Sequence, residues 1–397
     1  MRNNKKMNKK SQTARSGKKF WLLKLFMILL LLSGAFFGAR YVVRFASHTL
    51  FPVKEIADAA QNVLLKNGET ALQYSITEGL IPLSEKIIND FKNLDIENII
   101  ITQGSQQGLD LISKLYIDKG TVVFTETPSY LGALQAFQLF QANVIAIPSD
   151  EKGIQTDELE KKLKTNKPGL LYLMPNFQNP TGASIPMDRR HRLLEIAGKH
   201  DFMLIEDDPY GELIFEGEKL PSLFSLAQSK NFIYMSSFSK TIAPGFRVAY
   251  VIADKEIIKK FAIVKQGTDL HTNTFGQYIV NEYLENGNYQ EHISLIKRTY
   301  KERRDCMLSA MGKYFPKSAK WNCPAGGMFL WVQLPEGRDA REILMRCIEK
   351  DVAFVPGQEF FPAGGGKNTM RLNFSNARPE NIEEGIKRLG EVLKCMC

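Results

Sequence analysis

Two hydrophobic periods alternate along the chain after about residue 52, and they predict an α/β fold. Seven short apolar runs have the length of strands, and amphipathic stretches such as SQQGLDLISKLYI and MDRRHRLLEIAGKH lie between them with helical spacing. The predicted strands are 98–102, 121–126, 143–148, 169–174, 202–206, 232–236 and 247–253. Strands that are apolar throughout and separated by helices are typical of a parallel sheet covered on both faces. We therefore expect a large domain with a mostly parallel seven-stranded sheet covered by helices.

The pattern changes near residue 285. A long charged helical stretch, YQEHISLIKRTYKERRDCMLSAMGKYF, leads to the short apolar runs FLWVQL, VAFVP and MRLNFS. This texture predicts a smaller α+β domain built from N- and C-terminal parts of the chain. The predicted divisions are an atypical N-terminal segment (1–49), a large domain (50–285) whose first residues lead in from the small domain, and a small C-terminal domain (286–397).

Charge is distributed unevenly along the chain. The formal net charge of the 397 residues is +9, but residues 1–50 hold eleven of the 52 Lys and Arg residues and no Asp or Glu. The rest of the chain therefore carries 41 basic against 43 acidic residues, a net charge of −2. A nearly neutral body lacks the basic footprint of a nucleic-acid-binding protein. Its five cysteines are odd in number and lack metal-ligand spacing, which favours reduced thiols in the cytosol.

The N-terminal segment combines a basic stretch with a long apolar run. Residues 1–19 are rich in Lys and Arg, and FWLLKLFMILLLLSGAFFGA follows at 20–39, interrupted by Lys24. Such a run is about long enough to span a bilayer, and by itself it is typical of a signal-anchor or a signal peptide. The positive charge would keep residues 1–19 in the cytosol and place the rest outside.

Chemically versatile residues follow the carboxyl ends of the predicted strands, where open α/β sheets bind ligands. They are Ser105 and Gln106 in QGSQQ after 98–102, Tyr130 after 121–126, Asn179 after 169–174, Asp207 and Tyr210 after 202–206, Ser237 and Lys240 after 232–236, and Arg247 just beyond. Backbone N–H groups at a helix start can bind an anion, and a lysine can form a Schiff base with an aldehyde. The set suits a flat, phosphorylated pyridine aldehyde, with the carboxylate keeping the ring nitrogen protonated.

Nine motifs carry a family resemblance over roughly the whole chain after Leu50. They are LFPVKEI, ALQYSITEG, ITQGSQQGLDL, TETPSYLGAL, LMPNFQNPTG, IEDDPYGEL, SSFSKTIAPGFRVAY, PAGGMFLW and MRLNFS. In this order they resemble a fold-type I pyridoxal-phosphate-dependent aminotransferase of class I/II, close in texture to the 2-aminoadipate and aromatic aminotransferase branch.

The resemblance implies a role for each matching residue. Lys240 would be the Schiff-base lysine, and Asp207 would pair with the pyridine nitrogen. Tyr210 and Asn179 would bind the phenolic oxygen, and Tyr130 would stack on the ring. The residues implied for the phosphate are Ser105, Gln106, Ser237 and Arg247, with Tyr74 reaching the phosphate of a neighbouring subunit. Arg371 would bind the substrate α-carboxylate, and Asn179 would also contact the substrate. The expected cofactor is pyridoxal 5'-phosphate, the expected reaction moves an amino group from an L-amino acid to a 2-oxo acid by a ping-pong mechanism, and the expected assembly is a cytoplasmic homodimer.

Simpler structural interpretations stand beside several of these roles. Lys240 could be a solvated loop lysine, and Asp207 could be a helix N-cap. The segment that begins at Asn179 could be an ordinary turn, because Asn, Pro and Gly favour turns. Trp321 and Phe329 are most simply core residues. On the same scaffold, a β-lyase or a non-catalytic sensor domain is an alternative function. The sensor would be preceded by a helix-turn-helix domain, whereas residues 1–49 are apolar and basic.

The chain departs from the family pattern before LFPV. The family has a glycine-containing stretch resembling DIISFAGGLP there, and this chain has GARYVVRFASHTLFPV. The segment could be a genuine membrane anchor, an unusual packed helix, or a shifted reading frame, because the codon sets for 25–35 permit a Gly-Gly motif when read two nucleotides later. An anchor would remove the enzyme from the cytoplasmic cofactor, and the shifted frame is the interpretation we favour.

Overall fold

A computed structural model describes residues 47–227, 230–286 and 288–396, and the structural statements below concern that part of the chain. Within it, eight strands form the larger sheet in the spatial order β1-β8-β7-β6-β5-β2-β3-β4. Their bounds are β1 (Ile99–Thr102), β2 (Val122–Thr127), β3 (Asn143–Asp150), β4 (Gly153–Ile154), β5 (Leu170–Leu173), β6 (Met203–Asp207), β7 (Phe232–Ser237) and β8 (Ala249–Ile252).

The predicted strands and their mostly parallel arrangement are confirmed. The pairs β2–β3, β2–β5, β5–β6 and β6–β7 are parallel, whereas β8 runs antiparallel to both β7 and β1. The eighth strand, β4, was not predicted, because its two residues are too short for a hydrophobic period. It pairs antiparallel with the end of β3.

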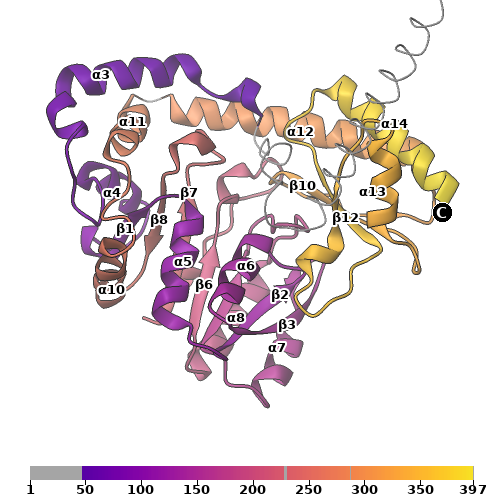
Figure 1. Ribbon diagram of the computed structural model, residues 1–397, viewed down its shortest axis with the longest axis horizontal. Coiled ribbons are helices and arrows are strands. Elements are labelled where there is room, and N and C mark those ends of the chain that lie inside the picture. The colour runs from indigo at the N-terminus through magenta and orange to yellow at the C-terminus, as the bar shows by residue number, and fades with distance from the viewer. Residues whose placement is uncertain (1–46, 228–229, 287, 397) are drawn as a thin grey trace, which may run out of the picture. The chain divides into compact units, whose positions relative to one another are not determined.

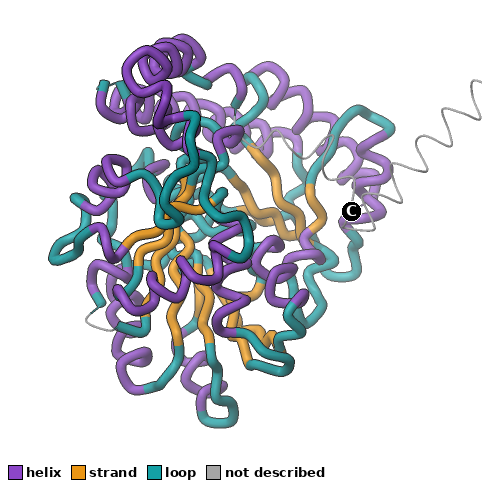
Figure 2. Tube along the Cα trace, turned by 60° about the vertical axis from the view of Figure 1, so that its left-hand side comes forward, coloured by secondary structure: helices purple, strands orange, loops and turns teal. Residues whose placement is uncertain are grey.

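Helices cover both faces of this sheet, and Figure 2 shows the strands enclosed between them. The helices of this part are α3 (Val53–Ala71), α4 (Ile81–Ile88), α5 (Ser105–Tyr116), α6 (Leu131–Leu139), α7 (Thr156–Leu163), α8 (Met187–Lys199), α9 (Leu223–Leu226), α10 (Lys255–Gln266) and α11 (Thr274–Glu285). Successive residues of β5 show the two faces. Leu171 and Leu173 pack with Leu193 of α8, whereas the ring of Tyr172 packs against Phe137 of α6.

The C-terminal part forms the expected α+β unit. Within the described residues, four strands make an antiparallel sheet in the order β11-β12-β10-β9. The strands are β9 (Lys320–Trp321), β10 (Phe329–Gln333), β11 (Val355–Pro356) and β12 (Thr369–Asn373), and the helices are α12 (Tyr289–Tyr314), α13 (Ala340–Ile348) and α14 (Pro379–Met396). Figure 1 shows α12 running from the region of α11 to α14. The domain boundaries themselves stay predictions.

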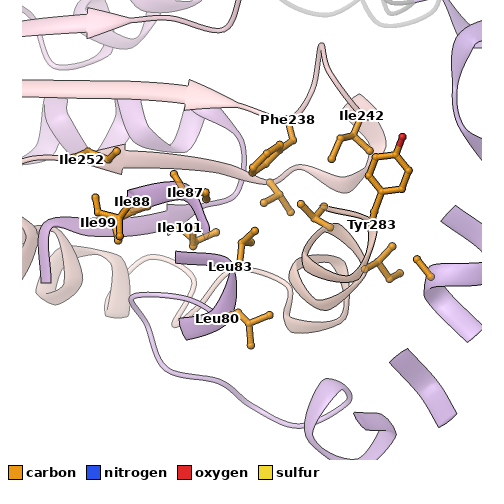
Figure 3. Close-up of a cluster of buried hydrophobic side chains, with 14 of the residues drawn as sticks. Leu80, Leu83, Ile87, Ile88, Ile99, Ile101, Phe238, Ile242, Ile252 and Tyr283 are labelled. Atoms are coloured by element: carbon orange, nitrogen blue, oxygen red, sulfur yellow. The ribbon is translucent and has the colours of Figure 1, made fainter. Parts of the chain in front are cut away.

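A buried apolar cluster anchors the loop that follows β7. Phe238 and Ile242 stand on either side of Lys240 in sequence, and both are buried in a cluster with Leu83 of α4 and Tyr283 of α11. Figure 3 shows these side chains directed toward one another. Because two flanking side chains are buried, the lysine backbone between them has little freedom.

The N-terminal predictions fall on residues that the structure does not describe. The apolar run at 20–39 and the expected small-domain contribution of residues before 47 lie outside the described part of the chain. Across the described residues, no helix has the length and apolar character needed to cross a bilayer.

Candidate active site

The topology brings five chain segments to one edge of the larger sheet. Because β1 and β7 both run antiparallel to β8, they point in the same direction as β2, β5 and β6. Thr102 and Ser237, each at the end of its strand, both pair with Ala249 at the start of β8. The loops after five strands and the Arg247 turn before β8 therefore meet at the carboxyl edge, as predicted.

Lys240 follows β7 and lies in an environment that disfavours its charge. Burial, reinforced by the positive charges of Arg247 and Arg371, lowers the pKa of the Lys240 amine to about 8. A lysine with a lowered pKa has a larger share of the neutral, nucleophilic form at physiological pH. The electrostatic surroundings of this amine are those that covalent bonding to an aldehyde requires.

Asp207 ends β6 and is fully buried. Its Oδ2 accepts a hydrogen bond of 2.7 Å from the hydroxyl of Tyr172, and its Oδ1 has no hydrogen-bond partner among the described residues. Burial raises the pKa of Asp207 to about 7, against the opposing effect of the Tyr172 hydrogen bond. A buried carboxylate oxygen without a partner is costly, and it suits a ligand that brings an N–H group.

Arg371, Asn179 and Tyr210 form a buried polar group beside these two residues. Arg371 Nη1 donates to Asn179 Oδ1 at 2.6 Å, although the two residues are 192 positions apart. The Asn179 side chain also interacts with Tyr210, whose pKa is raised chiefly by burial. Arg371 lies on β12, so the smaller sheet contributes directly to this site.

Two aromatic rings enclose the Arg371 guanidinium. Its Cζ atom lies 4.3 Å from the ring centroid of Phe329 and 5.2 Å from that of Phe360. Burial lowers the pKa of Arg371 to about 10, so the group remains charged at neutral pH. Phe329 is a core residue, as expected, but its ring also packs against the Arg371 guanidinium, a contact that the sequence did not reveal.

Tyr130 starts α6 and lies within electrostatic range of Asp207, Arg247 and Arg371. The side chain of Gln106 donates from Nε2 to the carbonyl of Gly132 at 3.0 Å, next to Tyr130. That contact occupies the side chain of Gln106, which leaves its backbone N–H as the group that could bind an anion.

The loop before α5 has the shape of an anion site. Gly104 has φ 78° and ψ 162°, a conformation that is essentially confined to glycine. A Cβ atom at this position would overlap the guanidinium of Arg247. Ser237 Oγ donates to Ser239 Oγ at 2.8 Å and accepts from the Ser239 N–H, so these hydroxyls lie side by side at the end of β7.

Tyr74 lies at the surface of its own chain. Its side chain is 77% exposed, and its ring approaches that of His271 edge-on, with centroids 5.7 Å apart. The expected role of Tyr74 at the phosphate of a neighbouring subunit stays a prediction.

Sequence reasoning missed Tyr172, Ser239 and Phe360. Tyr172 is hidden inside an apolar strand pattern, where a tyrosine is an ordinary core residue. The register of β5 and β6 could have found it only once the neighbouring strands were known, because Tyr172 pairs with Ile205, two residues before Asp207.

The residues present fit a phosphorylated pyridine aldehyde. The buried Asp207 Oδ1 can accept a ring N–H, the lysine of lowered pKa can bind an aldehyde, and the glycine turn beneath Arg247 can hold a phosphate. Fold and site together define the class of enzymes that use pyridoxal phosphate on a large α/β domain.

Comparison with known proteins gives the family. The chain matches the family described as aminotransferase class I and II over residues 40–389, and it belongs to that family. It is 44% identical over 348 residues to the 2-aminoadipate transaminase of Thermus thermophilus, a match that covers 87% of each chain. It is 43% identical to aromatic-amino-acid aminotransferase 1 of Thermococcus litoralis, covering 87% of this chain and 85% of the relative.

A solved structure agrees with the sequence relatives. The crystal structure of the alpha-aminoadipate aminotransferase of Thermus thermophilus, in complex with N-(5'-phosphopyridoxyl)-L-leucine, has a TM-score of 0.86 and 43% identity, and the match covers 89% of this chain and 91% of that one. The chain is therefore a fold-type I aminotransferase that uses pyridoxal phosphate, and its substrates are an amino acid and a 2-oxo acid. These relatives do not favour the lyase or the sensor alternative.

Proposed function

We propose that Lys240 is the amine that binds the cofactor aldehyde and then moves the substrate proton. The observation that carries this assignment is the lowered pKa of a lysine that follows β7 at the same sheet edge as Asp207 and lies within electrostatic range of Arg247 and Arg371. Pyridoxal phosphate, when bound, withdraws electrons from the substrate Cα. With the cofactor bound, Lys240 Nζ would act as the general base that accepts the proton from the substrate Cα and as the acid that returns it.

The other candidate residues would bind the cofactor and hold its ring in a fixed orientation. Asp207 Oδ1 would accept the ring N–H, and Tyr130 would stack on the ring. Asn179 and Tyr210, which already interact with each other, would donate to the phenolic oxygen. The phosphate would be held by Ser105, the Gln106 backbone, Ser237 and Arg247, of which Arg247 is exposed and open to an incoming anion.

Arg371 would bind the substrate α-carboxylate. A planar guanidinium can form two parallel hydrogen bonds to a carboxylate, and the rings of Phe329 and Phe360 limit its orientation. Because Asn179 bridges Arg371 and Tyr210, the carboxylate site and the cofactor site would be linked through one amide.

A homodimer with shared active sites is the assembly we propose. Tyr74 is exposed in its own chain, and apolar side chains gather before and after it in sequence: Val53, Leu65, Leu72, Ile76 and Ile81 are all exposed. Exposed apolar surface of this extent is typical of an interface. A second copy that covered it could receive Tyr74 at its cofactor phosphate.

The amino donors we propose are 2-aminoadipate and aromatic amino acids, as in the names of the two relatives described above. The proposed compartment is the cytoplasm, where pyridoxal phosphate and 2-oxo acids are available.

For residues 1–49, resequencing the start of the gene tests the proposed frame shift, and an intact frame through residue 50 would rule it out.

Absorbance spectroscopy tests the central assignment. Purified protein with added pyridoxal phosphate should show a visible band from the lysine-bound cofactor, and glutamate, 2-aminoadipate, an aromatic amino acid or alanine should change that band if it is a donor. Lys240→Ala should lose the visible band while Lys265→Ala, the same change at a buried lysine of α10, keeps it. A band that persists in Lys240→Ala would contradict the assignment. Steady formation of a 2-oxo acid without an amino acceptor would instead indicate a lyase.

A further inference from the structure

The sheet register places Tyr172 beside Asp207. β5 and β6 are parallel, and Tyr172 pairs with Ile205. Side chains two positions apart on a strand point to the same face, so Asp207 shares a face with Ile205 and with Tyr172. The Tyr172 hydroxyl donates to Asp207 Oδ2 at 2.7 Å.

This hydrogen bond determines which carboxylate oxygen faces the site. With Oδ2 occupied by Tyr172, Oδ1 is the oxygen without a partner among the described residues, and it is buried. Tyr172 itself has no exposed surface, and its ring is held edge-on by Phe137, with centroids 5.7 Å apart. The donor is therefore fixed in place before any ligand arrives.

The same contact also acts on the charge of Asp207. Burial raises the pKa of Asp207 and neighbouring Asp208 raises it further, whereas the Tyr172 hydrogen bond lowers it. The charge of Asp207 also raises the pKa values of Tyr130 and Tyr210, and the charge of Glu126 raises the pKa of Tyr172. The pKa of Tyr172 is raised well above its ordinary value by burial and by Asp207, so its hydroxyl stays protonated and donates throughout the physiological range.

We propose that Tyr172 is a positioning residue for the pyridine nitrogen: its hydroxyl orients the Asp207 carboxylate and keeps it ionised, so that Oδ1 can accept the ring N–H. This inference rests on the proposed role of Asp207. Tyr172, on the neighbouring strand β5, would control the orientation and ionisation of the Asp207 carboxylate without touching the cofactor.

Equilibrium titration of the apoprotein with pyridoxal phosphate tests the proposal, with intrinsic fluorescence as the readout. Tyr172→Phe removes one hydroxyl and leaves the ring in place. A hydrogen bond to a charged group contributes about 1.5–3 kcal/mol, so the dissociation constant should rise by about 10- to 140-fold. Because Asp207 must be ionised to accept the N–H, affinity should begin to fall at a higher pH in the variant than in the wild type.

Three controls separate positioning from a general structural effect. Tyr283→Phe makes the same change at another buried tyrosine whose hydroxyl has no partner among the described residues, and it should leave the dissociation constant unchanged. In an Asp207→Asn background, Tyr172→Phe should weaken binding by less than about threefold, because the coupling is lost. A cofactor analogue with C–H in place of the ring nitrogen should bind wild type and Tyr172→Phe equally.

Two results would overturn the proposal. One is an unchanged dissociation constant and pH profile in Tyr172→Phe, and the other is an equal loss of affinity for the analogue without ring nitrogen. In either case the visible band of the lysine-bound cofactor in the wild type would still support the proposed function. The experiment can therefore reject the role of Tyr172 without rejecting the role of Lys240.

Discussion

At the scale of single residues, burial changes the acid–base properties of ordinary side chains. Lys240 and Asp207 are both shifted toward their neutral forms, and in both cases desolvation is the largest cause. The sequence indicated which residues follow the strands, because that information is local. It could not indicate their pKa values, which depend on burial and on Arg371 and Tyr172 from distant positions.

The lowered pKa of Lys240 predicts the pH dependence of cofactor capture. The neutral amine is the nucleophile, and its fraction increases as pH rises through the pKa. The rate at which the apoprotein captures pyridoxal phosphate should therefore rise with a midpoint near the pKa of about 8, measured by stopped-flow absorbance. Arg371→Met removes a charge that lowers this pKa, so its midpoint should lie at higher pH. A wild-type midpoint at the ordinary lysine pKa would show that the amine is not perturbed.

At the scale of elements, the start of α5 combines a conformational requirement with a close approach. Gly104 has a backbone geometry that side chains rarely adopt, and the Arg247 guanidinium occupies the space where its Cβ would stand. The sequence predicted an anion site here from QGSQQ after a strand. The contact with Arg247, 143 positions later, required the pairing of β8 between β1 and β7.

Gly104→Ala should weaken cofactor binding more than it weakens the fold. A strained backbone costs about 1–3 kcal/mol, and the new methyl group should also displace Arg247 from the phosphate position. Gly120→Ala is the matched control, because Gly120 also has a positive φ, of 86°, but nothing lies within 4 Å of its Cβ position. The melting temperature of the apoprotein should fall in both variants. The dissociation constant for pyridoxal phosphate, measured by titration, should rise only in Gly104→Ala. Equal affinities would contradict the role of this loop.

At the scale of the whole molecule, the two sheets complete one site. Arg371 comes from β12 and Asn179 from the loop after β5, and their hydrogen bond joins the two parts. The segment around Tyr74 presents apolar side chains to solvent. In the proposed homodimer these exposed side chains would lie against a second copy of the chain.

Disruption of the exposed apolar surface should produce a monomer with weak cofactor binding. Leu65 is 77% exposed and Leu72 is 71% exposed, so replacing both with Asp should not disturb the core of one chain. We expect a dimer for the wild type and a monomer for the double variant in analytical ultracentrifugation, with reduced cofactor affinity because the partner's Tyr74 is lost. Leu139→Asp, at a position 80% exposed on α6, is the control and should remain dimeric. A monomeric wild type with full affinity would rule out the shared site.

The sequence by itself determined the order of strands and helices and the residues at the strand ends, because hydrophobic periodicity and motif spacing are local properties. It also identified Lys240 and Asp207 as candidates. Only the tertiary structure decided that Tyr172 contacts Asp207, that two aromatic rings enclose Arg371, and that Tyr74 is exposed at the surface. The physical reason is that burial, register and charge coupling arise between segments that are far apart in the sequence and meet only when the sheet forms.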